Sequence, residues 1–431
     1  MAYKEKIFWW DTVSLPVGRP DPLPEKVDVA VVGAGYTGLS AARVLARRGA
    51  AVAVLDAENV GWGASSRNGG MVLSGLKLSV EKLVARHGLQ ASKVMYAASL
   101  ASIDCVERLV REEQIACDFA RCGHLEVACK PAHFEAFARS AEFIARHFHH
   151  QMRVVPSQEL RAEIGSKIYF GGMVDEVSAG LNPARYVAGL ARAAQKAGAH
   201  LYDRARVTEI ADATRDGTRR LRLTTTRGTL WADTVVVGTS GYTGTATPFL
   251  QKRIVPIGSY IIVTQPLRDA LAQEISPRGR MIYDSKNYLF YYRLTPDQRM
   301  LFGGRAAFFP ETAGTIRRSA EILRRGMLQV YPQLRDVKVE YAWGGTLDFA
   351  FDIMPHAGRL GGIYYALGYA GHGVAMATYL GTAIGQAICG GTEQLPFSDI
   401  PFPRAPLGLY NGRPWFLPLA GAWYKVLDWI A

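Results

Sequence analysis

Apolar runs and helical patterns alternate from the first part of the chain. Residues 27–32 (VDVAVV) form a nearly continuous apolar run, as expected for a strand covered on both faces of a parallel sheet. Residues 36–48 have apolar positions on or near one face of a helix, with Gly49 as the predicted stop. Residues 51–55 repeat the strand pattern. The sequence therefore predicts a strand–helix–strand unit, preceded by a Pro-rich arm.

Helix and strand patterns continue to about residue 390. The segment GLNPARYVAGLARAAQKAGA predicts a helix with Asn182 as N-cap, Pro183 at its first position and Gly198 beyond its end. Further helices are predicted over residues 80 to about 114, in PAHFEAFARSAEFIARHF and in TIRRSAEILRRGMLQVYP. Strands are predicted in CGHLEVAC, ARVTEIA, RRLRLTTTRG, WADTVVVGTSG, IVPIGSYIIVTQPL, NYLFYYRL and RMLFGGRA.

The first turn has the spacing of a dinucleotide site. Gly33, Gly35 and Gly38 form G-x-G-x-x-G between the strand and the helix, where they allow a tight turn, backbone approach to a pyrophosphate and close helix packing. The helix N-terminus favours phosphate. Asp56 ends the second strand, where a carboxylate accepts hydrogen bonds from ribose hydroxyls. We therefore expect this unit to bind a dinucleotide, with Tyr36 and Thr37 at its phosphate end.

The segment NVGWGASSRNGGMV, after the second strand, favours FAD over NAD. Its glycines expose the backbone, with small serines and Arg67 between them. Such a loop can wrap a second phosphate and reach the far half of a longer cofactor, which a nicotinamide enzyme does not need.

These segments together resemble the D-amino-acid-oxidase-like superfamily of FAD enzymes, which includes glycine oxidase and sarcosine oxidase, and within it gamma-glutamylputrescine oxidases. The resemblance rests on DVAVVGAGYTGLSAA, GWGASSRNGG, GLNPARYVAGLARAA, MLFGGR, WGGTLDFAFDIMPHAG and GIYYALGYAGHGVAMA, which follow one another over nearly the whole chain. It implies a Rossmann-type FAD-binding domain of the α/β class (α+β overall), with an inserted substrate domain on a mixed or antiparallel sheet. The expected boundaries are 1–26 for the arm, 27–80, 170–245 and 340–392 for FAD binding, 81–169 and 246–339 for substrate, and 393–431 for the tail.

The resemblance also implies residue roles. Asp56 holds the adenosine ribose, although relatives more often have Glu there, and the backbone of Val207 meets the adenine. Thr239 ends a strand near the cofactor. The helix that starts in GHGV (residues 371–374) places its positive end near the flavin, with His372 there as a candidate catalytic residue. The other expected FAD contacts are Ala64, Ser65, Ser66, Arg67, Asn68, Gly69, Gly70, Gly371, Gly373 and Val374.

Three departures from the relatives refine the expected chemistry. YAWGGTLDFAFDIMP has no Cys and residues 57–80 have no His, so we expect non-covalent FAD. Residues 344–351 lack the Arg that binds a substrate carboxylate in many amino-acid oxidases of this group, which favours an amine. Ala375 stands where sarcosine oxidases have Lys.

The expected reaction is hydride removal from the carbon that bears an amine, followed by hydrolysis of the imine to an aldehyde. O₂ or another acceptor then takes the electrons. The candidate substrate-site tyrosines are Tyr260, Tyr283 and Tyr292, with Tyr288 and Tyr291 beside them. An amino-acid oxidase or dehydrogenase acting on glycine, sarcosine, proline or pipecolate is one alternative. A flavoprotein that delivers electrons at a membrane surface is another.

Composition narrows the setting. The net charge is +12, but the Lys and Arg residues occur in short runs only, so we expect dispersed surface charge and no nucleic-acid partner. Five cysteines without metal-site spacing indicate free thiols, no bound metal and a cytoplasmic location. Residues 360–392 lack charged side chains, yet their glycines and His372 indicate a buried strand and helix rather than a membrane span. The final 17 residues are predicted to form an aromatic-rich helix that packs on the protein, with membrane contact as an alternative.

Overall fold

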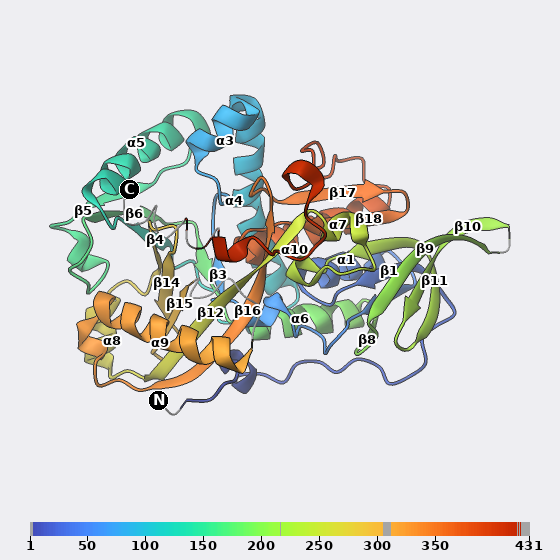
Figure 1. The fold of residues 1–431 in the computed structure, drawn as a ribbon, viewed down its shortest axis with the longest axis horizontal. Helices are drawn as coiled ribbons and strands as arrows, with labels where there is room; N and C mark the ends of the chain where they lie inside the picture. The colour runs from blue at the N-terminus through green and yellow to red at the C-terminus, as the bar shows by residue number, and fades with distance from the viewer. Residues whose placement is uncertain (1–2, 216, 305–311, 420, 422, 424–431) are drawn as a thin grey trace.

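Two sheets of eight strands organise the chain, and each has its own helical cover (Figure 1). The computed structural model describes residues 3–215, 217–304, 312–419, 421 and 423. The α/β class, with one Rossmann-type sheet and one mixed sheet, is confirmed.

The first sheet has the order β17-β18-β11-β1-β2-β8, and its central pairs are parallel. Strands β9 and β10 extend it as an antiparallel hairpin beside β11. Its strands are β1 (Lys26–Val32), β2 (Val52–Leu55), β8 (His200–Tyr202), β9 (Val207–Arg215), β10 (Thr218–Thr225), β11 (Gly228–Val237), β17 (His356–Leu360) and β18 (Ile363–Leu367).

Both faces of β1 are buried, which explains the nearly continuous apolar run in its sequence. Val29 and Val31 pack into the core beneath the helices, whereas Ala30 and Val32 pack into the core on the opposite face. Side chains alternate along a strand, so both faces of β1 are covered. The helices on the first face are α1 (Tyr36–Arg47), α6 (Pro183–Lys196) and α10 (Gly373–Ile388).

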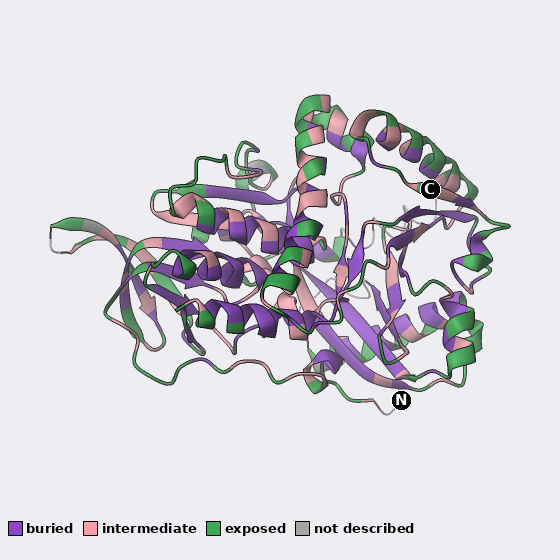
Figure 2. Cartoon of the chain, turned by 180° about the vertical axis from the view of Figure 1, so that it is seen from behind, coloured by how far each residue is buried: buried purple, intermediate pink, exposed green. Residues whose placement is uncertain are grey.

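The second sheet has the order β16-β12-β15-β14-β13-β4-β6-β5 and is antiparallel except between β13 and β4. Its strands are β4 (His124–Val127), β5 (Arg153–Pro156), β6 (Gly171–Asp175), β12 (Ile254–Pro266), β13 (Met281–Asp284), β14 (Phe290–Leu294), β15 (Arg299–Gly304) and β16 (Val339–Ala350). Helices α8 (Asp269–Ile275) and α9 (Ala313–Val330) cover one face, where Phe302 and Leu323 are fully buried (Figure 2).

The remaining elements lie outside the two eight-stranded sheets. They are α2 (Ala64–Arg67), α3 (Val80–His87), α4 (Leu89–Glu112), α5 (Pro131–Phe148), α7 (Pro248–Gln251), the paired strands β3 (Met71–Val72) and β7 (Ala179–Gly180), and the 3₁₀ turns η1 (Phe8–Asp11), η2 (Leu160–Ala162), η3 (Ser240–Tyr242), η4 (Pro332–Leu334) and η5 (Pro406–Gly408).

Three elements do not follow the boundaries of the expected domain division in their strand pairing or packing. Strands β6 and β16 belong to the second sheet, although their residues fall in the segments 170–245 and 340–392 that were expected to bind FAD. The reason is strand pairing, because β16 follows β12 along most of its length. Helix α4 lies within 81–169, yet Ile103 and Leu109 pack into the core of the first sheet with Leu380 of α10. The expected division into an FAD-binding domain and a substrate domain stays a proposal.

Several local predictions can be compared with the structure directly. The side chain of Asn182 caps α6 by accepting a hydrogen bond from the backbone N–H of Arg185. Gly88, with a φ of 78°, divides the helix predicted over 80–114 into α3 and α4. The uncharged segment 360–392 folds as β18 and α10. In the described part of the chain no helix combines the length and apolarity that a membrane crossing requires.

The terminal segments pack against the second sheet. Lys4 forms a bridge with Tyr341 of β16, and Trp9 in η1 is buried. Near the other end, Leu417 is buried and the Tyr288 hydroxyl donates to the Gly421 carbonyl at 3.0 Å. Most of the helix predicted for the final 17 residues lies outside the described residues.

Candidate active site

The glycine turn after β1 has the close contacts that its spacing predicts. Gly33 has a φ of 102°, which favours glycine. A Cβ on Gly38 would lie 2.0 Å from the Gly33 carbonyl oxygen, and one on Gly35 would lie 2.8 Å from the Ser65 Oγ. A side chain at Gly35 or Gly38 would collide with a neighbouring atom, and the backbone angle of Gly33 favours glycine. Helix α1 begins at Tyr36, within this turn.

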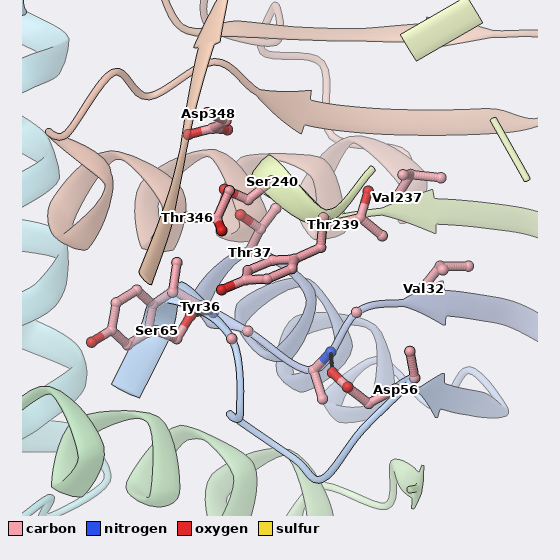
Figure 3. Close-up of a pocket in the computed structure, with 18 of the residues that line it drawn as sticks. Val32, Tyr36, Thr37, Asp56, Ser65, Val237, Thr239, Ser240, Thr346 and Asp348 are labelled. Carbon is pink, nitrogen blue, oxygen red and sulfur yellow. Dashed lines mark hydrogen bonds between the residues drawn. The ribbon is translucent and has the colours of Figure 1, made fainter. Parts of the chain in front are cut away.

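Asp56 lies at the end of β2 and supports this turn (Figure 3). Its carboxylate accepts hydrogen bonds from the backbone N–H of Ala34 at 2.8 Å and of Glu58 at 2.9 Å. Burial raises the pKa of Asp56, while these two hydrogen bonds act to lower it. The bond to Ala34 ties the carboxylate to the glycine turn, which the sequence analysis did not predict.

A cavity of about 380 Å³ opens at the carboxyl ends of β1, β2 and β11. This is the edge at which open parallel sheets bind ligands. The cavity is lined by many of the residues that the resemblance singles out: Gly33, Gly35, Tyr36, Thr37, Asp56, Ala64, Ser65, Asn68, Val207, Thr239, Gly371, Gly373 and Val374. Residues that the sequence analysis missed also line it, among them Ser240, Tyr242, Thr346 and Asp348.

Asp348 is the one of these four that carries a carboxyl group. It is a buried carboxylate on β16, and its Oδ2 accepts a hydrogen bond from the Gly368 N–H at 2.7 Å. Burial raises its pKa to about 6, with hydrogen bonds from Gly368 and Ser240 opposing the rise. A single Asp in an apolar strand was the signal that could have indicated it.

A second cavity, of about 150 Å³, adjoins the first. The two cavities share part of their lining, namely Ala64, Asn68, Thr346, Leu347, Gly371 and Val374. Arg67, Gly69 and His372 line only the smaller cavity, and His372 is the residue before α10. The remaining walls of the smaller cavity are Met71, Leu73, Lys77, Ser259, Ile261, Tyr283, Leu289, Tyr291, Gly345 and Ala370.

Three predicted cofactor contacts line neither cavity. Ser66 is fully buried, and its Oγ accepts a hydrogen bond from the Trp10 indole at 2.9 Å. Gly70 has a φ of 69°, and its carbonyl accepts from the Leu181 N–H and from Arg293. Gly38 acts through packing between α1 and β1. These three residues do not reach either cavity but support the residues that line it, through hydrogen bonds or close packing.

The loop around α2 is held by three tryptophans. The Trp9 indole donates to the Asn68 carbonyl and the Trp343 indole to the Arg67 carbonyl, each at 2.9 Å, while Trp10 donates to Ser66. Two of these tryptophans lie in the N-terminal arm and one in β16. The N-terminal arm and β16, which are far apart in the chain, therefore both hold the loop that lines the two cavities.

The tyrosines divide between cavity and core. Tyr283 and Tyr291 line the smaller cavity. Tyr260 and Tyr292, predicted for the substrate site, are instead buried in the core of the second sheet, where the Tyr292 ring stacks on Phe302. The reason is alternation along β14, which turns neighbouring residues 291 and 292 to opposite faces. Tyr288 lies in another cluster beside the C-terminal segment.

Behind Tyr283 lies a buried polar network. The Tyr283 hydroxyl is 3.2 Å from His124 Nε2, and His124 Nδ1 is 2.8 Å from the Ser178 Oγ. Burial lowers the pKa of His124, which favours the neutral ring. For Asp175, burial acts to raise the pKa, but hydrogen bonds from His150 and Ser74 and the nearby His124 outweigh it and bring the pKa to about 2.

A family model described as FAD dependent oxidoreductase matches residues 28–387. The chain belongs to this FAD-dependent oxidoreductase family. It is 31% identical to a gamma-glutamylputrescine oxidoreductase of Escherichia coli K12 over 413 residues, covering 95% of both chains. It is also 31% identical to a probable oxidoreductase OrdL of Haemophilus influenzae over 423 residues, covering 96% of this chain and 94% of that protein.

Solved structures share the fold of this FAD-dependent oxidoreductase. A glycine oxidase from Geobacillus kaustophilus superposes with a TM-score of 0.71 at 20% identity, covering 89% of this chain and 99% of that one. An L-proline dehydrogenase from P. horikoshii gives a TM-score of 0.70 at 20% identity, covering 87% and 96%. The predicted cofactor, FAD, is confirmed by the family.

The residues of the larger cavity fit this cofactor. The glycine turn has no room for Cβ atoms where a pyrophosphate must approach, and the first turn of α1 faces the space. Ala64 and Asn68 line both cavities, so further space adjoins the larger one, as a cofactor with a second ring system requires. In the described residues, no group of three or more His, Cys, Asp or Glu side chains is placed to hold a metal ion.

Proposed function

We propose that this oxidoreductase oxidises the C–N bond of a small amine that resembles gamma-glutamylputrescine, using non-covalently bound FAD. The relative that acts on gamma-glutamylputrescine, by its name, matches nearly the whole length of this chain. The amino-acid oxidases among the solved structures match at 20% identity and share the fold. What separates the two substrate classes is a carboxylate next to the reacting carbon.

The observation that carries the proposal is the position of the arginines around the smaller cavity. The wall formed by β16 presents Gly345, Thr346 and Leu347. Arg293, which could compensate for a missing arginine there, does not line the cavity and donates to the Gly70 carbonyl at 2.8 Å. Among the described residues, Arg67 is the arginine that lines this cavity, and its guanidinium donates to the Trp62 and Gly344 carbonyls. In the described part of the chain, β16 therefore offers a carboxylate on the reacting carbon no bidentate guanidinium partner. An amine needs no such partner.

The apolar walls also suit an amine. Met71, Leu73, Ile261 and Leu289 line the smaller cavity together with the rings of Tyr283 and Tyr291. Removing an ammonium group from water lowers its pKa, so the cavity favours the neutral amine, whose nitrogen lone pair assists hydride loss.

Roles for the cofactor side follow from the larger cavity. FAD, when bound, accepts the hydride from the carbon next to the nitrogen. Asp56 would face the ribose, Val207 the adenine, and Ala64, Ser65 and Asn68 the middle of the cofactor. The N-terminus of α10, headed by His372 and Gly371, would stabilise negative charge that develops near the ring. Residues 57–80 contain no His and 341–355 no Cys, which supports non-covalent binding.

The overall reaction balances with water and an electron acceptor. The substrate loses a hydride and a proton to give an imine, and water converts the imine to an aldehyde and ammonia. O₂ or another acceptor then takes the two electrons. The residues that this chain contributes bind and orient the amine and exclude water from the reacting carbon.

Anaerobic bleaching of the flavin tests the proposal. The yellow holoenzyme is mixed without oxygen with gamma-glutamylputrescine, putrescine, glycine, sarcosine or proline, and absorbance near 450 nm is followed. We expect rapid bleaching by gamma-glutamylputrescine and none by glycine, sarcosine or proline. Bleaching by an amino acid alone would overturn the amine assignment and leave the family unchanged.

A further inference from the structure

A charged cluster borders the smaller cavity on the side of the second sheet. Lys77 and Tyr283 line this cavity and do not line the larger one. Lys77 lies in the segment between β3 and α3, and its side chain is half-buried. None of the roles described above uses this lysine.

Glu126 lies beside Tyr283 in the second sheet, within electrostatic range of Lys77. Glu126 on β4 is the register partner of Tyr283 on β13, so the two side chains leave their parallel strands on the same face. Glu126 is hydrogen-bonded to Tyr283. Burial raises the pKa of Glu126 to about 7, and the positive charge of Lys77 opposes this rise. The carboxyl group and the ammonium group therefore interact at the cavity wall.

Arg67, the other positively charged residue that lines the smaller cavity, is hydrogen-bonded to backbone carbonyls. The Arg67 guanidinium donates to the Trp62 carbonyl at 2.9 Å and to the Gly344 carbonyl at 3.2 Å, and it lies 4.1 Å from the centre of the Trp62 ring. Among the described residues, Lys77 and Arg67 are the Lys and Arg side chains that line this cavity. Both cations line the smaller cavity and not the larger one, and Lys77 comes from the segment between β3 and α3, beyond the loop that the tryptophans hold.

We propose that Lys77 binds a carboxylate at the end of the substrate remote from the oxidised nitrogen, and that Glu126 positions the Lys77 ammonium group. This inference rests on the proposed amine-oxidising function and adds the recognition of the substrate's far end. Lys77 is a specificity residue, whereas Glu126 acts through Lys77.

The placement of Lys77 distinguishes a remote carboxylate from one on the reacting carbon. The reacting carbon must meet the cofactor where the two cavities join, at the six residues that line both. Lys77 belongs to the smaller cavity alone, and apolar residues such as Met71, Leu73 and Leu289 share that wall. The arrangement fits an amine, a chain of methylene and amide groups, and a far end that carries a carboxylate. Gamma-glutamylputrescine has this order of groups.

Three probes that differ at the far end test the inference. Gamma-glutamylputrescine and N-glutarylputrescine both carry a carboxylate, whereas N-acetylputrescine keeps the reacting amine and the amide and lacks the carboxylate. The flavin-loaded wild type, Lys77→Met and Lys77→Arg are compared by anaerobic bleaching at a series of probe concentrations. The half-saturating concentration and the limiting rate are measured separately.

We expect Lys77→Met to raise the half-saturating concentration of both carboxylate-bearing probes roughly tenfold to a hundredfold, the range for losing a charge-assisted hydrogen bond. The limiting rate and the response to N-acetylputrescine should change less than about twofold, because the amine still meets the cofactor. Lys77→Arg should recover most of the affinity. Glu126→Gln should weaken binding of the two carboxylate-bearing probes and leave N-acetylputrescine unaffected.

Matched controls and outcomes separate the inference from the function on which it rests. Lys82→Met, an exposed lysine of α3, should match the wild type with every probe. Equal losses for all three probes in Lys77→Met, or no loss in any, would overturn the role of Lys77 while the amine chemistry stands. If no probe bleaches the wild type, the proposed function fails and the inference fails with it. Flavin content and melting temperature show whether each variant is folded.

Discussion

The two adjoining cavities are built from different parts of the polypeptide. The larger one is shaped by a glycine turn, by the ends of parallel strands and by a carboxylate that holds the turn's backbone. The smaller one is shaped by side chains from β12, β13, β14 and β16 and from the segment after α2. The larger cavity therefore depends on local residue spacing, whereas the smaller cavity depends on which strands pair and in which register.

The largest effect in this comparison should come from the glycine turn. In Gly38→Ala the new Cβ would lie 2.0 Å from the Gly33 carbonyl oxygen, so α1 must move away from β1. We expect a loss of about 3 kcal/mol or more in unfolding free energy and purification without flavin. Urea denaturation and the 450 nm absorbance of the purified protein measure both.

A second glycine serves as the control for this change. Gly314 lies in α9, where a Cβ would have its nearest neighbour 3.9 Å away. Gly314→Ala should retain flavin and be neutral or slightly more stable. A Gly38→Ala protein that keeps its flavin and its stability would show that the turn tolerates displacement, and the contrast between the two cavities would weaken.

An intermediate effect should come from the polar wall of the smaller cavity, and it should depend on pH. Glu126 has an ordinary pKa near 4.5 and a folded-state pKa of about 7, so between these values the folded chain keeps a proton that the unfolded chain has lost. Stability contributed by the protonated form is present below pH 4.5 and decreases as pH rises to 7. Glu126→Gln should therefore gain about 2 kcal/mol over the wild type at pH 8 and nearly nothing at pH 4.5.

Urea denaturation at the two pH values measures this gain. Glu135→Gln, on the exposed side of α5, provides a surface control that should show no such difference. A gain for Glu126→Gln that is the same at both pH values would mean that the carboxyl group is not forced toward its neutral form by burial.

The smallest effect should distinguish neighbouring tyrosines on β14. Tyr292→Phe removes the contact of its hydroxyl with the Tyr169 hydroxyl at 2.8 Å, in the core. We expect a loss of about 1 kcal/mol in stability and unchanged flavin bleaching. Tyr291→Phe, which alters the cavity and the contact with Ser259, should change substrate affinity. Stopped-flow bleaching compares the two, and altered substrate affinity in Tyr292→Phe would reverse the assignment of faces.

The glycine turn illustrates what could be predicted from the sequence. Gly33, Gly35, Gly38 and Asp56 occur in one segment of continuous chain, so their spacing indicates the strand, turn and helix that place them. Most predicted helices and strands correspond to observed elements for the same reason. The turn residues then lie at the cavity or directly behind it.

The substrate side could not be predicted in the same way. Tyr260 and Tyr292 are aromatic residues in strands, as residues that line a pocket often are. Their positions along the strands instead direct both side chains into the core of the second sheet. Lys77 lies in a loop without a pattern, and it becomes significant because β13 and β4 place Tyr283 and Glu126 beside it. Long-range pairing sets these positions, and no local pattern encodes it.

The tryptophan anchors have a consequence for the order of assembly during synthesis. The loop that faces both halves of the cofactor is held by Trp9 and Trp10, made near the start of translation, and by Trp343, made near the end. Contacts between such distant parts of a chain form late in folding. The nascent chain can therefore complete this set of contacts only after β16 has been made, because the Trp343 hydrogen bond comes from that strand.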